Sequence, residues 1–217
     1  MKRKVIGIDL DEVLRSYKSH LVYYYHKANN LKIENIDYES FNDKSFDEIL
    51  DFKEENITTF YIDNDIDVAY ATRNKITKEE KTVTKNDKIY EFLYVDYLLE
   101  LYGMTKKIHM NIGVDLNKLI SKYNEKYKFI ILFKDKLITF APTLLFLANI
   151  RPMVSEVKIV DNDLDLTENC DIYITANENY LKVFNKENII LVNNNNKIKH
   201  NKKINKLSDL IDSKILD

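Results

Sequence analysis

Two periods of apolar and polar residues run through the chain, and together they predict helices that alternate with strands. Spacing close to the helical period predicts helices over residues 13–28, 89–102, 116–127 and 142–149. Short runs that are apolar throughout predict buried strands before Asp9 and at 128–133, 157–160, 172–175 and 189–192. Such strands are typical of a parallel sheet with helices on both faces. The pattern therefore predicts an α/β fold built on a doubly wound parallel sheet.

Two stretches interrupt this alternation. Residues 31–88 carry short patches of aromatic and acidic side chains divided by polar turns, so we expect an insertion with a small structure of its own. Residues 193–206 contain four consecutive asparagines and a basic run, which is typical of a solvated loop, and a short helix is expected over 207–216. At 217 residues the chain can form one sizeable core with a smaller appended region.

Composition narrows the classes of partner. The chain has 33 basic and 35 acidic side chains, so its net charge gives no reason to expect nucleic acid or an anionic membrane. The single cysteine, Cys170, excludes an intramolecular disulfide and a zinc site made of several cysteines. No stretch approaches the roughly 18 apolar residues of a membrane span, and the first apolar run is broken at Asp9. We therefore expect a protein that is cytoplasmic at synthesis.

The candidate chemistry lies at the end of the first strand. Asp9 and Asp11 are two residues apart, so in an extended backbone both carboxylates project from one face into the crevice at the strand's carboxyl end. They suit a metal and phosphate site, or they accept backbone amides of the following loop as a structural motif. Glu12 and Arg15 are open to the same choice, between ligand contact and the roles of a helix-start acid and a solvated arginine.

The run Ile6-Gly7-Ile8-Asp9-Leu10-Asp11-Glu12-Val13-Leu14 resembles the first motif of the haloacid dehalogenase superfamily. The local match is nearest to the 5'(3')-deoxyribonucleotidase-like branch and to related proteins of tailed bacteriophages. The resemblance implies a Rossmann-type core formed by residues 1–15 and 114–217. Residues 16–113 then stand where that family places its cap insertion.

The resemblance also implies roles for individual residues if the chain is active. Asp9 would be the nucleophile that takes the phosphoryl group, and Asp11 would be the general acid and base. Both would bind Mg²⁺, with Asp171 as a third candidate ligand, because a divalent ion must offset the repulsion between carboxylate and phosphate. The basic residue that holds the phosphate would be Lys134, Lys158 or Arg151.

Two of the family's motifs are not matched. Phe133 stands where the family has a hydroxyl that binds a phosphate oxygen, and Thr175 and Ala176 stand where it has acidic metal ligands. Positioning and charge neutralisation supply most of the rate in phosphoryl transfer, so these losses predict a non-catalytic structural or assembly protein without a cofactor. The phage resemblance implies a virion component such as a tail or neck ring or connector. The alternatives are a Mg²⁺-dependent phosphomonoesterase or 5'-nucleotidase with an aspartyl-phosphate intermediate, and a phosphate-binding sensor.

Protein partners are expected at the tyrosines of the first predicted helix. Tyr23, Tyr24 and Tyr25 are consecutive and cannot all face the core, and tyrosine is enriched at interfaces because it combines a large apolar area with a polar tip. We therefore expect at least one of them to lie at a protein interface. A homo-oligomer or a larger assembly is the expected state of the chain.

Overall fold

The computed structural model describes residues 3–41, 44, 46–63, 75–193 and 199–217. The chain divides into two compact units: Met1–Asn42 with Tyr97–Asp217, and Asp43–Asp96. The division groups 16–42 and 97–113 with the unit that holds the large sheet. The predicted insertion bounds of 16–113 stay a prediction.

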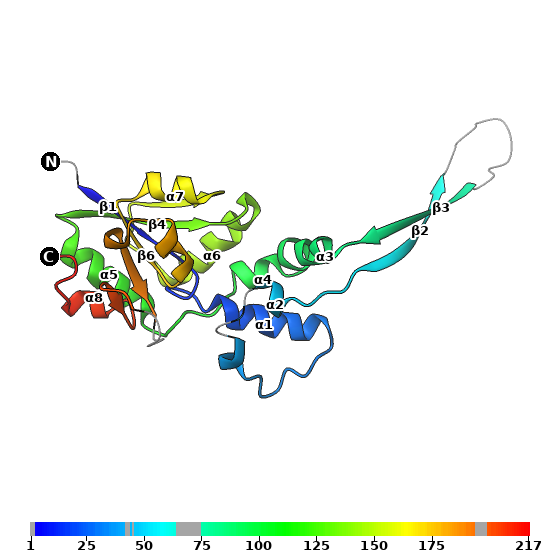
Figure 1. The fold of residues 1–217 in the computed structure, drawn as a ribbon, viewed down its shortest axis with the longest axis horizontal. Coiled ribbons are helices and arrows are strands. Elements are labelled where there is room, and N and C mark those ends of the chain that lie inside the picture. The colour runs from blue at the N-terminus through cyan, green and yellow to red at the C-terminus, as the bar shows by residue number, and fades with distance from the viewer. Residues whose placement is uncertain (1–2, 42–43, 45, 64–74, 194–198) are drawn as a thin grey trace. The chain divides into compact units, whose positions relative to one another are not determined.

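A six-stranded parallel sheet forms the centre of the first unit (Figure 1). The strands are paired in the order β5-β4-β1-β6-β7-β8, and every pair is parallel. Their bounds are β1 Lys4–Ile8, β4 Tyr127–Lys134, β5 Glu156–Val160, β6 Ile172–Thr175, β7 Ile189–Val192 and β8 Lys203–Ile204. The predicted α/β fold with a parallel sheet is confirmed, and the architecture is compatible with a Rossmann-like fold.

Helices cover both faces of this sheet. One face packs against α5 (Ile112–Tyr123), α6 (Phe140–Ile150) and α8 (Asp209–Asp212), and the other against α7 (Asp163–Asn169) and the 3₁₀ helix η4 (Glu178–Lys182). In Figure 1, α5 and α8 lie on one side of the strands and α7 on the other. Strand residues therefore alternate between two apolar clusters, as expected of strands that are buried on both faces.

The remaining elements of this unit are short, apart from α1. They are α1 Tyr17–Ala28, η1 Tyr38–Phe41, η3 Leu137–Thr139, η5 Lys186–Asn188 and α4 Leu98–Tyr102. Gly113, near the start of α5, permits a close helix contact, because a Cβ there would collide with the carbonyl oxygen of Ile150 at the end of α6. Gly103 is the C-cap of α4 and its amide donates to Leu99 O, so the helical segment ends at residue 102, where the helix predicted over 89–102 ends.

The second unit consists of a β-hairpin and short helices. Its elements are α2 Phe46–Ile49, β2 Glu55–Asp63, β3 Lys75–Val83, α3 Lys85–Glu91 and a π-helical turn, η2 Phe92–Asp96. β2 and β3 pair antiparallel, from Glu55 opposite Val83 to Asp63 opposite Lys75. Thr84 and Asp87 form a capping box that begins α3, and Lys88 of that helix binds Glu55 at 2.8 Å. The ion pair joins the start of β2 to α3, which follows β3 directly.

Several sequence predictions differ from the structure. The helix expected over 13–28 begins at Tyr17, and the helix expected over 207–216 spans only Asp209–Asp212. The helix expected over 89–102 is divided into α3, η2 and α4. The helix expected over 116–127 starts at Ile112, so Asp115 lies inside it and Asn111 is its N-cap. The loop expected over 193–206 contains β8, whose Ile204 is buried against the core; residues 194–198 of that loop lie outside the described residues.

Candidate functional site

The candidate site lies where the strand order reverses. β1 is central: β4 and β5 follow on one side of it, and β6, β7 and β8 lie on the other. In open α/β sheets, ligands bind at the carboxyl ends of the strands beside such a point. Asp9 comes directly after β1, and its amide donates to Ile174 O of β6 at 2.9 Å. The sequence prediction that Asp9 projects from this edge is therefore consistent with the topology.

Asp9 is buried and both of its carboxylate oxygens accept hydrogen bonds. Asp9 is 9% exposed. Thr175, the last residue of β6, donates from Oγ1 to Asp9 Oδ2 at 2.6 Å, and the amide of Leu10 donates to Oδ1 at 2.9 Å. The first of these bonds joins β1 to β6 directly across the point where a ligand would enter.

Burial changes the acidity of Asp9. Loss of water around the carboxylate raises its pKa to about 7, and the negative charge of Asp11 adds to this rise. Hydrogen bonds from Thr175, Leu10 and Tyr173 act in the opposite direction and offset part of the rise. Asp9 is therefore partly protonated at neutral pH, which weakens it as a nucleophile.

Asp11 has a different partner. Its Oδ1 accepts from Arg15 Nε at 2.5 Å, in an ion pair whose arginine side chain is 1% exposed and whose aspartate side chain is 39% exposed. The solvated arginine predicted from the sequence is wrong: Arg15 is among the largest fully buried side chains. The positive charge inside the fold is compensated by Asp11 at the edge of the crevice.

The guanidinium of Arg15 is enclosed by aromatic rings and oxygen atoms. Its Nη1 donates to Tyr102 O at 3.1 Å, with a longer contact of 3.4 Å to Thr143 Oγ1. The centre of the guanidinium lies 5.3 Å from the Tyr17 ring, 5.4 Å from the Tyr102 ring and 6.0 Å from the Phe146 ring. Cation–π attraction and hydrogen bonds therefore hold the charge in place. The cluster connects the loop after β1 to α1, α4 and α6.

Glu12 follows Asp11 directly, and its side chain binds the start of α1. Its backbone has a φ of 60°, in the left-handed region, and its Oε1 accepts from the amide of Lys18 at 2.7 Å. That amide is one of the donors that a helix start leaves without an intrahelical partner. Burial raises the pKa of Glu12. Of the two roles that the sequence left open, this contact favours that of an acid at the helix start, although Glu12 precedes the first turn of α1.

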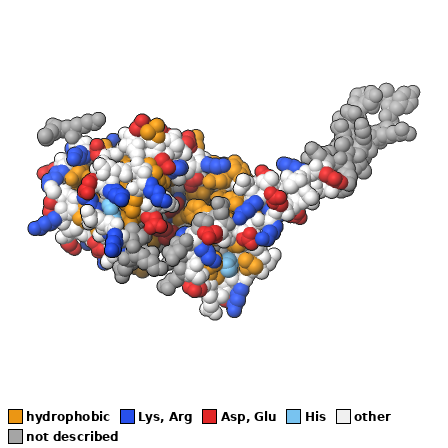
Figure 2. Space-filling view, viewed as in Figure 1, with side chains coloured by type: hydrophobic (Ala, Val, Ile, Leu, Met, Phe, Trp, Pro, Cys, Tyr) orange, Lys and Arg blue, Asp and Glu red, His pale blue; other side chains and the backbone are white. Residues whose placement is uncertain are grey.

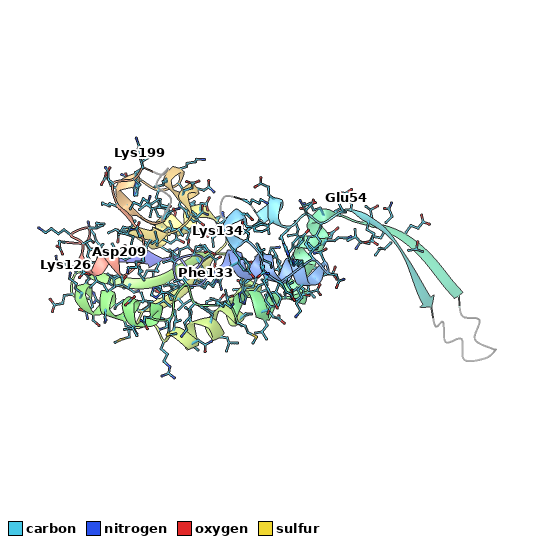
Figure 3. The ribbon with its side chains drawn as sticks, turned by 90° about the horizontal axis from the view of Figure 1, so that it is seen from below. Glu54, Lys126, Phe133, Lys134, Lys199 and Asp209 are labelled. Carbon is cyan, nitrogen blue, oxygen red and sulfur yellow. The ribbon has the colours of Figure 1, made fainter. Side chains whose placement is uncertain are left out.

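The predicted phosphate-binding residues have local partners. Lys134, at the carboxyl end of β4, binds Asp163 at 2.7 Å. Lys158 lies within β5, bonds to Asn169 at 2.9 Å and forms an ion pair with Glu156 at 3.4 Å. Figure 3 marks Lys134 beside Phe133, which is buried and has no hydroxyl to donate. Of the two lysines, only Lys134 stands at the strand ends that face the crevice.

Asp171 does not lie with Asp9. Its Oδ2 accepts from the amide of Val5 at 2.7 Å, and its own amide donates to Val5 O. Val5 is near the start of β1, whereas Asp9 follows its end, so the two aspartates lie at opposite ends of the paired strands. The prediction of Asp171 as a third ligand is corrected accordingly. Among the residues that the structure describes, no three His, Cys, Asp or Glu side chains gather in a way that could hold a metal ion.

The predicted interface tyrosines are half-buried on α1. Tyr24 packs against Tyr23, His20 and Tyr97, with ring centroids 5.1, 5.5 and 5.2 Å away, and Lys27 Nζ lies 5.5 Å from the Tyr24 ring centroid. Tyr25 contacts the ring of His26 at 6.3 Å. Part of each tyrosine stays accessible. Their role at an interface stays a prediction.

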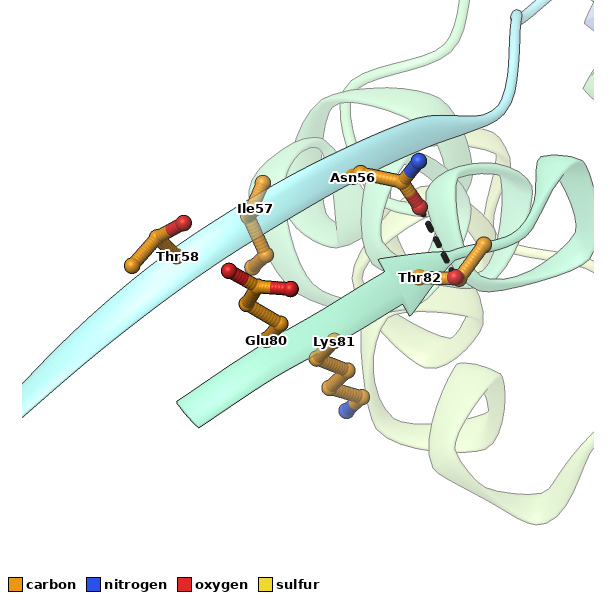
Figure 4. Close-up of a pocket in the computed structure, with 6 residues that line it drawn as sticks. All are labelled: Asn56, Ile57, Thr58, Glu80, Lys81 and Thr82. Carbon is orange, nitrogen blue, oxygen red and sulfur yellow. Dashed lines mark hydrogen bonds between the residues drawn. The ribbon is translucent and has the colours of Figure 1, made fainter. Parts of the chain in front are cut away.

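A shallow recess on the hairpin of the second unit is too open for a built site (Figure 4). It is lined by Asn56, Ile57, Thr58, Glu80, Lys81 and Thr82. All six are exposed, and Thr82 Oγ1 donates to Asn56 Oδ1 at 2.8 Å. No buried polar group among these six points into it, so it is an open face of a two-stranded ribbon.

Comparisons with known proteins add no identification. No model of a protein family matches the chain, and no curated protein matches it. No helix among the described residues combines the length and the apolar character needed to span a bilayer.

Proposed function

We propose that this chain is a non-catalytic assembly protein on a Rossmann-like α/β fold. The observation that carries the proposal is the 2.6 Å hydrogen bond from Thr175 to Asp9, which joins the carboxyl ends of β1 and β6 through the protein's own side chains. With Leu10 N on the other oxygen, both acceptor atoms of the would-be nucleophile have internal donors. Such a carboxylate completes the fold and is not poised to attack a phosphate.

The residues present do not fit a Mg²⁺ site of the kind that the sequence resemblance implies. Magnesium takes oxygen ligands in near-octahedral geometry. Asp11 already pairs with the buried guanidinium of Arg15, and this fixed cation repels a second one. Thr175 stands where the implied site needs a carboxylate, and Asp171 is at the other end of the strands.

This edge of the sheet also offers few groups that could bind a phosphate. Phe133 provides no donor, and the charge of Lys134 is directed to Asp163. A purely phosphate-binding sensor would need donors that converge on one point, and the hydrogen bonds described here converge on the protein's own carboxylates instead. These contacts favour assembly over both enzymatic catalysis and sensing.

The surface of the first unit supports a role in association. Large apolar side chains are highly exposed there: Met110 is 88%, Leu137 72% and Met153 66% exposed. Contiguous exposed apolar surface marks interaction sites, and we infer that such side chains contribute to one. Figure 2 shows basic and acidic side chains interspersed over this unit, with no broad area of a single sign on the face in view. A ring or connector role in a virion is what the sequence resemblance alone implies.

The proposal is tested by assaying turnover and mass on the same full-length protein. The chain is incubated with an aryl phosphate and with deoxynucleoside monophosphates in excess Mg²⁺, beside Asp9→Asn and a control, Asp161→Asn, in an exposed loop. We expect no turnover that depends on Asp9, no heat of binding on calorimetric titration with the nucleotides, and a mass above that of the monomer by light scattering. Turnover that Asp9→Asn abolishes and Asp161→Asn preserves would overturn the proposal in favour of a phosphomonoesterase.

A further inference from the structure

The two strands of the second unit each have an outer edge. Among the residues that the structure describes, β2 and β3 form a sheet of two strands, so each has a neighbouring strand on one side. The backbone amides and carbonyls on the other side form a template for a further strand. A ribbon of two strands is marginally stable in water, and added strands stabilise it. The outer edges of this hairpin are therefore candidate contact surfaces.

Both strands have the regularity that pairing requires. Residues 55–63 and 75–83 contain no proline or glycine, and the two strands pair one to one over all nine residues, without a bulge. Proline, bulges and short strands are among the features that protect an edge. A strand of this length spans about 30 Å and forms roughly nine backbone hydrogen bonds with a further strand. A typical interface has about ten hydrogen bonds, so one edge is long enough for a specific contact.

The charges of the two strands are complementary. β2 has an acidic residue at each end, Glu55 and Asp63, and residues 56–62 are uncharged. β3 has three basic residues and two acidic ones: Lys75, Lys78, Lys81, Glu79 and Glu80. Residues directly opposite each other on paired strands stabilise a sheet when their charges are opposite and destabilise it when they are alike. β2 is net negative and β3 net positive, which favours contact between unlike strands.

Pairing of unlike strands also fits the register of the hairpin and uses both edges. In the hairpin, Asp63 stands opposite Lys75, and no two residues of like charge are opposite each other. The same register between two copies repeats this arrangement. By contrast, full antiparallel overlap of two β2 strands puts Glu55 opposite Asp63 of the second copy, and that of two β3 strands puts Glu79 opposite Glu79. Either of these pairings also leaves one edge of each copy open.

We propose that β3 of one copy pairs antiparallel with β2 of the next copy, in the register that the hairpin itself uses, so that the hairpins of successive copies form one continuous sheet. This inference deepens the proposed function, on which it rests, by naming the surface and the partner. The contact is heterologous, because two different edges meet. Contacts of this kind close into rings or continue as filaments.

The first test is disulfide formation between two variants of the full chain. Ile57 stands opposite Lys81 in the ladder, and both are exposed (Figure 4). Ile57→Cys and Lys81→Cys chains are prepared separately, mixed and oxidised; the native Cys170 is buried and does not compete. Each disulfide therefore joins two chains. Opposite Cα atoms of paired strands lie within the roughly 7 Å that a disulfide needs, so we expect the mixed disulfide to form readily.

The matched control replaces Lys81→Cys by Thr82→Cys. Thr82 is the next residue of β3 and is also exposed, but successive side chains of a strand point to opposite faces of the sheet. We expect the mixed disulfide with Lys81→Cys to form roughly tenfold faster than the one with Thr82→Cys. Equal rates in the two mixtures, or disulfides that form chiefly between identical chains, overturn the inference.

The second test measures the size of the assembly by sedimentation velocity of the unchanged chain over a wide concentration range. A heterologous contact adds a copy at either edge of the hairpin, so species larger than the dimer are expected to appear as the concentration rises. An isologous contact would stop at two copies. A distribution that ends at the dimer, or a monomer at every concentration, overturns the inference.

Failure of this inference can be told apart from failure of the proposed function. A protein that assembles without turnover, but in which the two cysteine mixtures react alike, retains the proposed function through another surface. A monomer at every concentration overturns the hairpin contact whatever the assay of turnover shows. Turnover that depends on Asp9 overturns the function even if the hairpins pair as described.

Discussion

Asp9 and Asp11 stand two residues apart on one loop, yet the protein treats them in opposite ways. Asp9 is buried among neutral donors, Thr175 Oγ1 and the amide of Leu10, and its pKa is raised to about 7. Asp11 remains 39% exposed at its side chain and faces the full positive charge of Arg15. The sequence spacing alone would assign both to one metal site. Their surroundings show different roles. Asp9 joins β1 to β6 through Thr175, whereas Asp11 compensates the charge of Arg15.

The difference shows which partner decides a carboxylate's chemistry. Burial favours protonation of a carboxylate, and a hydrogen bond from a neutral hydroxyl offsets only part of that effect because it does not cancel the charge. A guanidinium compensates the negative charge directly, in an ion pair that is also a hydrogen bond. A catalytic pair of this kind needs both carboxylates free to meet a metal and a phosphate. In this loop each is committed to a different internal contact.

The largest predicted loss of stability follows from changing Arg15, the partner of Asp11. Arg15→Met removes the buried cation and its contacts with three rings and with Tyr102 O, while leaving Asp11 able to reach water. Because Asp11 is partly exposed, the cost is below that of stranding a fully buried charge, at about 2–4 kcal/mol of unfolding free energy. Denaturant unfolding at neutral pH measures it.

Arg15→Lys separates charge from shape in the same experiment. Lysine keeps the positive charge beside Asp11 but cannot reproduce the planar donor arrangement or stack between rings. We expect it to recover part of the loss only. A variant Arg15→Met as stable as the unchanged chain would show that the buried ion pair contributes nothing, and the contrast between the two aspartates would disappear.

The next prediction is that the free energy of unfolding depends on pH through Asp9. The folded-state pKa of about 7 lies above the unfolded value of 3.8, so between these pH values only the folded state holds the proton. The contribution of Asp9 to stability is therefore fully present below pH 3.8 and is lost as pH rises through about 7, by about 1.4 kcal/mol per pH unit. Asp9→Asn removes this dependence.

The measurement is the difference in unfolding free energy between Asp9→Asn and the unchanged chain from pH 5 to pH 8. The variant should gain relative stability steadily up to about pH 7 and no further. Asp161→Asn, in an exposed loop, serves as the control and should run parallel to the unchanged chain. Parallel curves for Asp9→Asn as well would mean that the pKa of Asp9 is ordinary.

The sheet could be predicted from the sequence because its strands are apolar runs. The run expected at 128–133 is β4, Tyr127–Lys134, and the runs at 172–175 and 189–192 coincide with β6 and β7. The strand order was not encoded in any local pattern. β8 escaped prediction because it has two residues in a polar stretch, and its pairing with Leu191 and Val192 of β7 decides its structure. The apolar periodicity of 89–102 likewise continues through η2 without marking the change of helix type.

The site could be predicted only in part, for a similar reason. Asp9, Asp11 and Thr175 were identified as residues at strand ends, but the hydrogen bond that joins β1 to β6 depends on side chains 166 residues apart. For Arg15 the available signal was its position four residues after Asp11. Its burial depends on Tyr102 and Thr143, which are 87 and 128 residues further along the chain. Such long-range contacts leave no periodic trace in a single sequence.

The smallest effect concerns Glu12, whose backbone turns the chain directly after Asp11. Glu12→Ala removes the acceptor for Lys18 N and leaves a buried helix-start amide with one partner fewer, at a cost of about 1 kcal/mol. Glu12→Gly loses the same acceptor but adopts the φ of 60° more readily, so it should be more stable than the alanine variant by about 0.5–1 kcal/mol. Glu12→Gln keeps an acceptor oxygen and should unfold close to the unchanged chain. Thermal unfolding of the three variants side by side measures the order Gln, Gly, Ala. If Gly and Ala were equal, the turn would carry no strain, and the separate fates of Asp9 and Asp11 would follow from their side-chain partners alone.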